Sequence, residues 1–146
     1  MRTVVQPNLV PCDKRRILIT DDEASVRNIF RMILASGIPD CTIDVASNGL
    51  DAVQSFGQFH QGVLLMDLKM PIMDGQTAFY KIRDTCNEKN WEMPTVIFCT
   101  GFSPPSGVKT LAAHEKNHCI IQKPVTSEIL LDTVKSRMPD RSLAGS

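Results

Sequence analysis

The stretch from Val63 to Gly75, which reads Val-Leu-Leu-Met-Asp-Leu-Lys-Met-Pro-Ile-Met-Asp-Gly, decides the fold that we expect for the whole chain. Its first four residues are apolar without interruption, which is typical of a strand buried on both faces of a parallel sheet. The run ends at Asp67, after which a proline and a glycine turn the backbone. We therefore expect Asp67 at the carboxyl end of a central strand, the edge where open α/β sheets bind ligands. Asp is also common in the loops that follow strands, so this stretch alone does not exclude a purely structural role for Asp67.

Four more short apolar runs have the length of strands, and helical patterns separate them. The strand-like runs are residues 16–20, 41–46, 95–100 and 119–122, of which 41–46 alternates like a strand nearer an edge. The helical patterns cover about residues 24–36, 48–59, 75–87, 108–116 and 126–138, with Asn48 and Thr126 as candidate caps. Five strands that alternate with five helices predict an α/β fold with a doubly wound, five-stranded parallel sheet.

Composition favours one cytosolic domain. The 146 residues are 42% hydrophobic, and 16 Lys and Arg balance 16 Asp and Glu, so neither nucleic acid nor an anionic membrane is suggested. No apolar run approaches the roughly 20 residues that cross a bilayer, and the N-terminus is not a signal peptide. The five cysteines are odd in number and widely spaced, which favours reduced thiols in a cytoplasmic protein. We expect a mobile extension at residues 1–14, a domain at 15–138 and a polar tail at 139–146.

Polar side chains follow four of the five predicted strands. They are Asp21 and Asp22, Asp67, Thr100 and Lys123. Because parallel strands end at one edge of their sheet, these groups are expected to share a pocket. Three clustered carboxylates repel one another unless a hard dication such as Mg²⁺ lies among them. With that ion in place a phosphoryl group is the fitting substrate, because a Lys and a Thr hydroxyl can hold its oxygens while a carboxylate attacks phosphorus.

Each of these residues also has an ordinary explanation when it is taken alone. Asp21, Asp22 and Glu23 at a helix start complement the helix dipole. A lysine before a proline, or a threonine at a strand end, is common in loops. The occurrence of all of them at four strand ends in the right order favours the functional interpretation.

The same residues resemble the receiver domain of two-component response regulators. The resemblance rests on Asp21-Asp22, on Asp67 followed by Met70-Pro71-Ile72-Met73-Asp74-Gly75, on Thr100 and on Lys123-Pro124, and it extends over about residues 16–138. It implies a flavodoxin-like (βα)₅ fold, similar to that of the single-domain chemotaxis regulators. It also implies a phosphoacceptor that takes a phosphoryl group from a sensor histidine kinase or a histidine phosphotransfer protein, as a self-catalysed signalling reaction rather than as a classical enzyme.

The resemblance implies a role for each matching residue. Asp67 is the phosphorylated nucleophile, and Mg²⁺ is bound by Asp22 directly, by Asp21 largely through water, by Asp67 and by the backbone carbonyl of Lys69. Lys123 pairs with the phosphoryl group, and its bond to Pro124 is expected to be cis as in the family. Thr100 bonds a phosphoryl oxygen and reports phosphorylation to the surface of the last two helices and strand.

Two departures from the family pattern alter these expectations. The usual aromatic switch residue is replaced by Ile120, so either Ile120 packs differently in two states or the signal from Thr100 runs through the loop at residues 102–107. The positions that tune loss of the phosphoryl group hold Lys69 and Phe102. We hypothesise that Phe102 shields phosphorus from water and that Lys69 pairs with the phosphate, so that the phosphorylated state is long-lived and autodephosphorylation is slow.

Three other functions remain as alternatives. The segment His114-Glu115-Lys116-Asn117-His118 matches the zinc protease signature H-E-x-x-H, but it runs straight into a strand pattern, so a solvated helix end is expected instead. An aspartyl phosphatase lacks support because Leu68 and Lys69 replace its D-x-D pattern. A degenerate receiver that serves only as an interaction module is disfavoured because every phosphorylation residue is present.

The sequence does not decide how the chain passes its signal on to a downstream partner. About eight residues follow the last predicted helix, too few for a DNA-binding domain, so we expect either a stand-alone receiver that docks on a downstream protein or a receiver cut from a larger protein. A homodimer through the last helix, strand and helix is possible.

Overall fold

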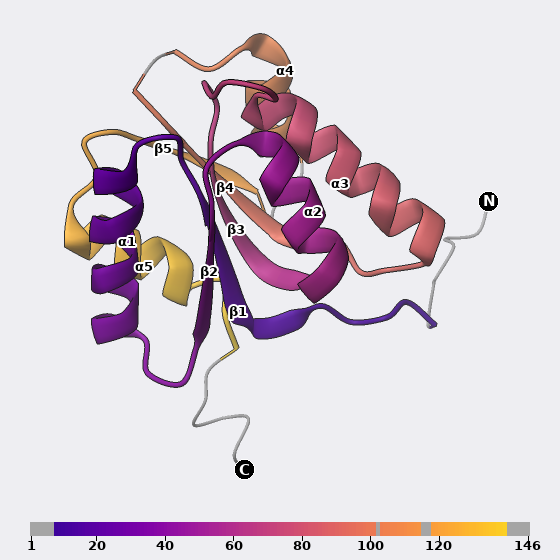
Figure 1. Cartoon of the computed structure of the whole chain (residues 1–146), viewed down its shortest axis with the longest axis horizontal. Helices are drawn as coiled ribbons and strands as arrows, with labels where there is room; N and C mark the ends of the chain where they lie inside the picture. The colour runs from indigo at the N-terminus through magenta and orange to yellow at the C-terminus, as the bar shows by residue number, and fades with distance from the viewer. Residues whose placement is uncertain (1–7, 102, 115–117, 140–146) are drawn as a thin grey trace.

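The computed structural model describes residues 8–101, 103–114 and 118–139, and in them one parallel sheet forms the centre of the molecule (Figure 1). Its strands lie in the order β2-β1-β3-β4-β5, and all four neighbouring pairs are parallel. The bounds are Asp13–Thr20 for β1, Thr42–Ala46 for β2, Gln61–Asp67 for β3, Thr95–Thr100 for β4 and Cys119–Gln122 for β5. The strand at residues 42–46 is at an edge, as its alternating pattern predicted.

Helices cover both faces of the sheet. Their bounds are Ala24–Gly37 for α1, Gly49–Phe59 for α2, Gly75–Lys89 for α3, Ser106–His114 for α4 and Ser127–Lys135 for α5. Helices α1 and α5 pack on one face, and α2, α3 and α4 pack on the other (Figure 1). The predicted flavodoxin-like, doubly wound fold is therefore confirmed.

The central strand β3 contributes side chains to two hydrophobic cores, one on each face of the sheet. All seven of its residues are buried, and successive side chains point to opposite faces. Leu64 and Met66 join the core under α2, α3 and α4, whereas Val63 and Leu65 join the core under α1 and α5. The uninterrupted apolar run is thus the sequence signature of a strand that serves both cores.

Side-chain caps fix where several helices begin. The side chains of Asn48 and Thr126 accept hydrogen bonds from the backbone N–H groups of Asp51 and Ile129, as predicted. Asp74 does the same for α3 by accepting from the N–H of Thr77, at 2.8 Å. The start of α3 is therefore fixed by the residue that precedes Gly75.

The N-terminal segment differs from the expectation of a mobile extension over residues 1–14. Strand β1 begins at Asp13, and Val10 already pairs with Trp91 in an isolated parallel bridge. The N–H of Val10 donates to the carbonyl of Asn90, and the carbonyl of Val10 accepts from the N–H of Glu92. Cys12 is buried, and its N–H donates to the Glu92 carboxylate at 3.1 Å. The expectation is wrong from Val10 onward, because backbone pairing with a distant loop holds this segment, while residues 1–7 lie outside the described part.

His118 also differs from the expectation of a solvated helix end. Helix α4 spans Ser106–His114, residues 115–117 lie outside the described part, and His118 directly precedes β5. The His118 side chain is buried, accepts a hydrogen bond from the N–H of Val96 at its Nδ1 atom and lies edge-on to the ring of Phe79. His118 is therefore part of the packing between β4, β5 and α3 rather than a zinc ligand on the helix that holds His114.

None of the helices within the described ranges combines the length and the apolar composition that a bilayer-spanning segment requires.

Candidate functional site

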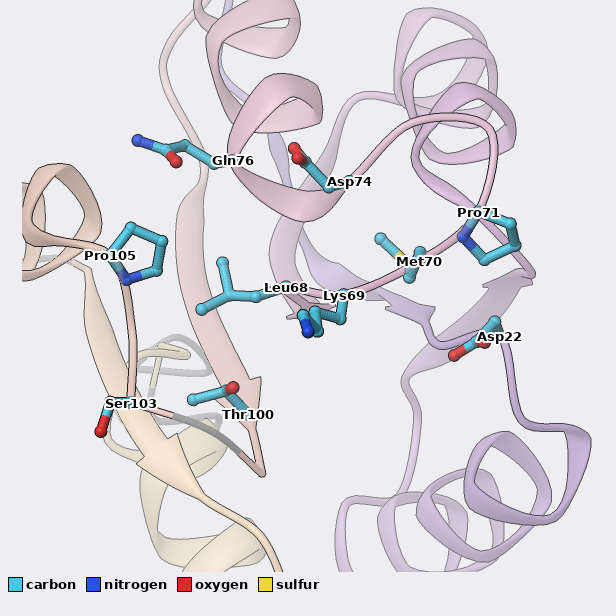
Figure 2. A pocket seen from close by; sticks show the side chains of 10 residues that line it. All are labelled: Asp22, Leu68, Lys69, Met70, Pro71, Asp74, Gln76, Thr100, Ser103 and Pro105. Carbon is cyan, nitrogen blue, oxygen red and sulfur yellow. The ribbon is translucent and has the colours of Figure 1, made fainter.

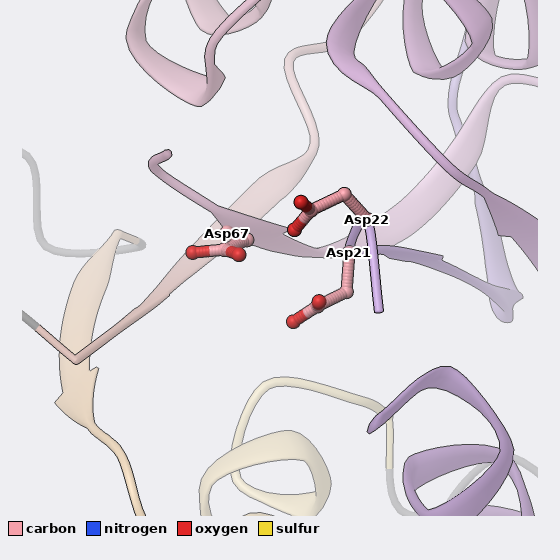
Figure 3. A group of neighbouring side chains, drawn as sticks. All are labelled: Asp21, Asp22 and Asp67. Carbon is pink, nitrogen blue, oxygen red and sulfur yellow. The ribbon is translucent and has the colours of Figure 1, made fainter. Parts of the chain in front are cut away.

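Three carboxylates meet at the carboxyl edge of the sheet, as the strand ends predicted (Figure 3). Asp21 and Asp22 follow β1, and Asp67 ends the neighbouring strand β3. One oxygen from each carboxylate lies within 4.8 Å of the others. Asp21 and Asp67 are buried, whereas Asp22 is exposed and faces the opening. The cluster therefore has a buried floor and a side that is accessible from solvent.

Lys123 places a cation beside two of the three carboxylates. It follows β5, and its Nζ lies 2.7 Å from Oδ2 of Asp21 and 3.4 Å from Oδ2 of Asp67. Its backbone N–H donates to the carbonyl of Thr100 at 2.9 Å, which joins the ends of β4 and β5. The peptide bond between Lys123 and Pro124 is cis. The single ammonium thus balances only part of the negative charge of the cluster.

The close approach of these charges and their burial shift the pKa values of Asp67 and Lys123. Burial first, and then the charge of Asp21, raise the pKa of Asp67 above its ordinary value, while Lys123 partly opposes both effects. Burial by itself lowers the pKa of Lys123, but the hydrogen bond and charge of Asp21, together with the charge of Asp67, outweigh it and raise that pKa. Lys123 therefore stays protonated at neutral pH, and Asp67 carries a charge that its surroundings do not fully stabilise.

The backbone after Asp67 is packed too closely for a side chain at Gly75. A Cβ atom added to Gly75 would lie 2.2 Å from the carbonyl oxygen of Asp67. The N–H of Gly75 also donates to the carbonyl of Leu68 at 2.9 Å. Gly75 thereby closes the loop that follows β3 and packs directly on the backbone of Asp67.

A pocket of about 580 Å³ adjoins the carboxylates (Figure 2). It extends from the loop after β3 to the loop after β4. Its lining residues are Asp22, Leu68, Lys69, Met70, Pro71, Asp74, Gln76, Thr100, Ser103 and Pro105. A group bound at Asp67 would thus have open space on the side of Lys69 and Thr100.

The remaining predicted residues occupy different places. Thr100 is buried at the end of β4 and lines the pocket, and Lys69 is exposed on the pocket rim. Ile120 is half-buried on β5, next to Phe98 of β4, and packs against the core under α2, α3 and α4. Phe102 lies outside the described residues, so its predicted shielding role stays a prediction.

The residues present fit a hard divalent cation. Carboxylate oxygens are the ligands that Mg²⁺ prefers, and the three donors converge with one side open. Two of them are buried like charges with one shared ammonium, an arrangement that a dication stabilises. Asp21, Asp22 and Asp67 are therefore the candidate metal-binding side chains.

Two supporting contacts were not predicted from the sequence. The guanidinium of Arg27 donates to the backbone carbonyl of Asp21 at 2.6 Å, and Gly75 packs on the Asp67 carbonyl. The Asp-Gly pair at the start of α3 was a usable signal for the second contact, because glycine marks a close backbone approach. The first depends on how α1 lies against the loop, which no local pattern specifies.

Comparison with known protein families matches residues 17–135 to the response regulator receiver domain. The chain belongs to this family. The matched range includes all five strands from Ile17 onward and every strand end of the site. The family that the sequence motifs predicted is therefore confirmed.

The chain is similar to parts of proteins of several kinds. The chain is 31% identical over 127 residues to the transcription factor SKN7 of Saccharomyces cerevisiae, covering 84% of the chain and 19% of that protein. It is 33% identical over 70 residues to the chemotaxis protein CheY of Halobacterium salinarum, covering 48% of the chain and 57% of that protein. The chain also matches 23% of the length of a protein-glutamate methylesterase/protein-glutamine glutaminase of Methanosarcina acetivorans. It spans only about a fifth of the first and last of these proteins.

Solved structures support the fold. The chemotaxis protein CheY4 of Vibrio cholerae superimposes with a TM-score of 0.67 at 20% identity, covering 84% of this chain and 98% of that one. The signal receiver domain of a DNA-binding response regulator of Colwellia psychrerythraea gives a TM-score of 0.68 at 27% identity, covering 83% and 95%.

Proposed function

We propose that the chain is the phosphoacceptor of a two-component phosphorelay, and that Asp67 takes a phosphoryl group from a phosphohistidine on a sensor histidine kinase or a histidine phosphotransfer protein. The observation that carries the proposal is the arrangement of three carboxylates and one ammonium at the carboxyl edge of the sheet, with Lys123 next to both Asp21 and Asp67. The family match supports it.

The transfer uses the groups of this chain in distinct roles. An oxygen of Asp67 forms a bond to phosphorus while the bond from phosphorus to the donor imidazole breaks, and the electron pair of that bond stays on the imidazole nitrogen. Lys123 and Thr100 hold phosphoryl oxygens and so stabilise the charge of the transition state. Water later attacks phosphorus, which returns the Asp67 carboxylate and releases inorganic phosphate.

Mg²⁺ would be held by Asp21, Asp22, Asp67 and the backbone carbonyl of Lys69. When bound, it neutralises charge on the phosphoryl oxygens and on the carboxylates. The chain itself orients the acceptor through the contacts of Gly75 and of Lys123 described above.

The direct test is the intact mass of the protein after incubation with acetyl phosphate, with Mg²⁺ or with excess EDTA. We expect a gain of one phosphoryl group only with Mg²⁺, and its loss in hydroxylamine, which cleaves acyl phosphates but not phosphoserine. Circular dichroism in both buffers controls for folding. No gain by a folded protein with Mg²⁺ would contradict the proposal and favour an interaction module, whereas stoichiometric zinc in the purified protein would reopen the hydrolase alternative.

Slow loss of the phosphoryl group is the second part of the proposal. Lys69 lies on the pocket rim next to the acceptor, where its ammonium can pair with a phosphate. We expect Lys69→Ala and Phe102→Ala each to shorten the lifetime of the phosphorylated protein by about threefold to tenfold, since each removes a charge partner or a shield against water. The decay is followed by intact mass after removal of the donor, with Lys109→Ala, at an exposed lysine of α4, as the matched control. Unchanged decay in both variants would show that neither residue protects the phosphate.

The output is proposed to be a docking surface. Phosphorylation would be reported through Thr100 and through β5, where Ile120 packs against the core in place of an aromatic residue, or through the loop at residues 102–107. The surface would bind a downstream protein or a second copy of the chain. Neutral net charge and five buried or half-buried free cysteines support a cytoplasmic protein that does not bind DNA through this domain.

A further inference from the structure

A thiol, an amine and a carboxylate are in direct contact at the start of β1. The Sγ atom of Cys12 lies 3.0 Å from Nζ of Lys14 and 3.3 Å from Oε1 of Glu92. Lys14 also forms an ion pair with Glu92, and the backbone N–H of Cys12 donates to the same Oε1 atom at 3.1 Å. A single carboxylate oxygen therefore accepts hydrogen bonds from three donors of one short segment.

The backbone on both sides of this cluster keeps the three groups together. Strand β1 begins at Asp13, and residues two apart in an extended chain point to the same side, which places the side chains of Cys12 and Lys14 next to each other. Glu92 is held against them because its N–H donates to the carbonyl of Val10 at 2.8 Å. The contact between sulfur and nitrogen thus follows from the pairing of two distant segments.

The other cysteines differ from Cys12 in what their sulfur atoms contact. The thiols of Cys41, Cys86 and Cys99 each donate to a backbone carbonyl. Within the described residues, Cys12 is the one cysteine that hydrogen-bonds to a side-chain amine. An oxidised sulfur condenses with a nitrogen nucleophile but not with a carbonyl oxygen. Cys12 therefore has a reaction available that these three cysteines lack.

The surroundings of Cys12 favour this reaction over further oxidation. Cys12 is buried, whereas the side chains of Lys14 and Glu92 are 43% and 40% exposed, so a small oxidant reaches the sulfur past these two groups. Burial raises the pKa of the Cys12 thiol, and Lys14 partly opposes it, so the first oxidation is slower than at an exposed thiolate. A sulfenic acid at this sulfur is already in contact with the Lys14 nitrogen, which traps it before a second oxidant molecule arrives.

We propose that Cys12 and Lys14 form an oxidative modification site, in which hydrogen peroxide joins Sγ of Cys12 to Nζ of Lys14 as a sulfenamide. In the first step sulfur attacks one peroxide oxygen and the O–O bond breaks, which oxidises the thiol to a sulfenic acid and reduces the other oxygen to water. In the second step the Lys14 ammonium gives one proton to the sulfenic hydroxyl, which leaves as water, and the freed electron pair of nitrogen forms the bond to sulfur. The Glu92 carboxylate takes a second proton, and the nitrogen keeps one hydrogen.

The new bond weakens the attachment of the N-terminal segment to the loop at residues 90–92. It removes the S–H donor and replaces the ammonium by a neutral N–H, so Glu92 loses two of its charge-stabilising contacts. The backbone pairing of Val10 with this loop then opens more often. The site lies at the amino end of β1, whereas Asp67 ends the parallel strand β3, so the inference does not depend on the proposed function.

The experiment treats the full chain with about 1 mM hydrogen peroxide in thiol-free buffer. Free thiols are then blocked with N-ethylmaleimide, and tryptic peptides are analysed by tandem mass spectrometry without reduction. We expect a peptide of residues 3–15 that is about 2 Da lighter than its sequence requires, is not cleaved after Lys14 and is restored by dithiothreitol. The amides of Val10 and Glu92 should exchange with deuterium about tenfold faster in the oxidised protein.

Three variants separate the amine from the thiol. Lys14→Arg keeps the positive charge beside Glu92, but a guanidinium stays protonated and does not attack sulfur, so the light peptide should be absent. Trapping of the sulfenic acid by dimedone should rise by about fivefold or more in this variant. Lys109→Arg, at an exposed lysine of α4, and Cys86→Ala, at a thiol that contacts the Glu92 carbonyl, should both give the light peptide as the wild type does.

Each other outcome overturns a defined part of the inference. A wild-type Cys12 that keeps its free thiol, or that gains about 32 Da as a sulfinic acid to the same extent as in Lys14→Arg, shows that the amine traps nothing. A disulfide between Cys12 and Cys86 would make the other thiol the partner, and a cross-link about 14 Da heavier would contradict a direct bond between nitrogen and sulfur. Unchanged amide exchange would contradict the loosening of the segment. Failure of acetyl phosphate to modify Asp67 bears on the proposed function alone.

Discussion

Replacement of Asp67 by asparagine is expected to abolish phosphorylation while the fold stays intact. Asparagine has nearly the same shape but lacks the nucleophilic carboxylate, so no acyl phosphate can form. Stability should be unchanged or slightly higher, because burial and Asp21 raise the pKa of Asp67, which means that the folded state disfavours its charged form. The 2.7 Å ion pair between Lys123 and Asp21 does not involve Asp67, so we expect it to persist in the variant. The measurement is the intact mass after treatment with acetyl phosphate and Mg²⁺, together with thermal unfolding.

Asp84→Asn is the matched control for this experiment. Asp84 is an exposed carboxylate on α3, so its replacement removes the same charge away from the site. It should gain one phosphoryl group as the wild type does. Phosphorylation of the Asp67 variant at the wild-type level would show that another residue is the acceptor and would remove the basis of the proposed mechanism.

Replacement of Gly75 by alanine is expected to destabilise the protein by about 3 kcal/mol. The new methyl group would lie 2.2 Å from the Asp67 carbonyl oxygen and 3.0 Å from Cγ of Met66. The first of these atoms is backbone of the central strand, so the clash can be relieved only by moving β3 or the start of α3. Urea unfolding measures the change as a lower midpoint.

Gly57→Ala separates this effect from the general consequence of adding a methyl group. Gly57 lies inside α2, and a Cβ atom there would meet nothing within 4 Å. Because alanine favours a helix interior over glycine, this variant should be as stable as the wild type or more stable by up to about 1 kcal/mol. A Gly75 variant that unfolds at the same urea concentration as the Gly57 variant would show that the loop after β3 can relax without cost.

The elements of the fold were predictable because their signals are local. The apolar run at residues 63–66 and the spacing of Val26, Phe30 and Leu34 report burial on both faces of a strand and on one face of a helix. Caps such as Asn48 and Thr126 act over three residues, so the sequence contains both partners. The meeting of Asp21, Asp67 and Lys123 followed from the rule that parallel strands end at one edge.

The features that were missed depend on contacts between distant parts of the chain. Val10 and Cys12 are held by the segment at residues 90–92, about 80 positions away, so no local pattern distinguishes them from a mobile terminus. The burial of His118 requires the N–H of Val96 to face it across neighbouring strands. Ile72 has a positive φ of 72°, which isoleucine by itself disfavours, and the carbonyl of the next residue, Met73, accepts from the N–H of the distant Gly49.

The bridge between Val10 and Trp91 determines how the protein can be attached to a surface or a label. Val10 precedes the amino end of β1, whereas Asp67 stands at the carboxyl end of the parallel strand β3, so the two residues lie at opposite edges of the sheet. An affinity tag, a fluorophore or a biosensor tether placed before Val10 would therefore be attached at the edge of the sheet opposite to the pocket that Lys69 and Thr100 line. Immobilisation through this end leaves the acceptor open to a soluble donor, so transfer rates on a chip and in solution should agree.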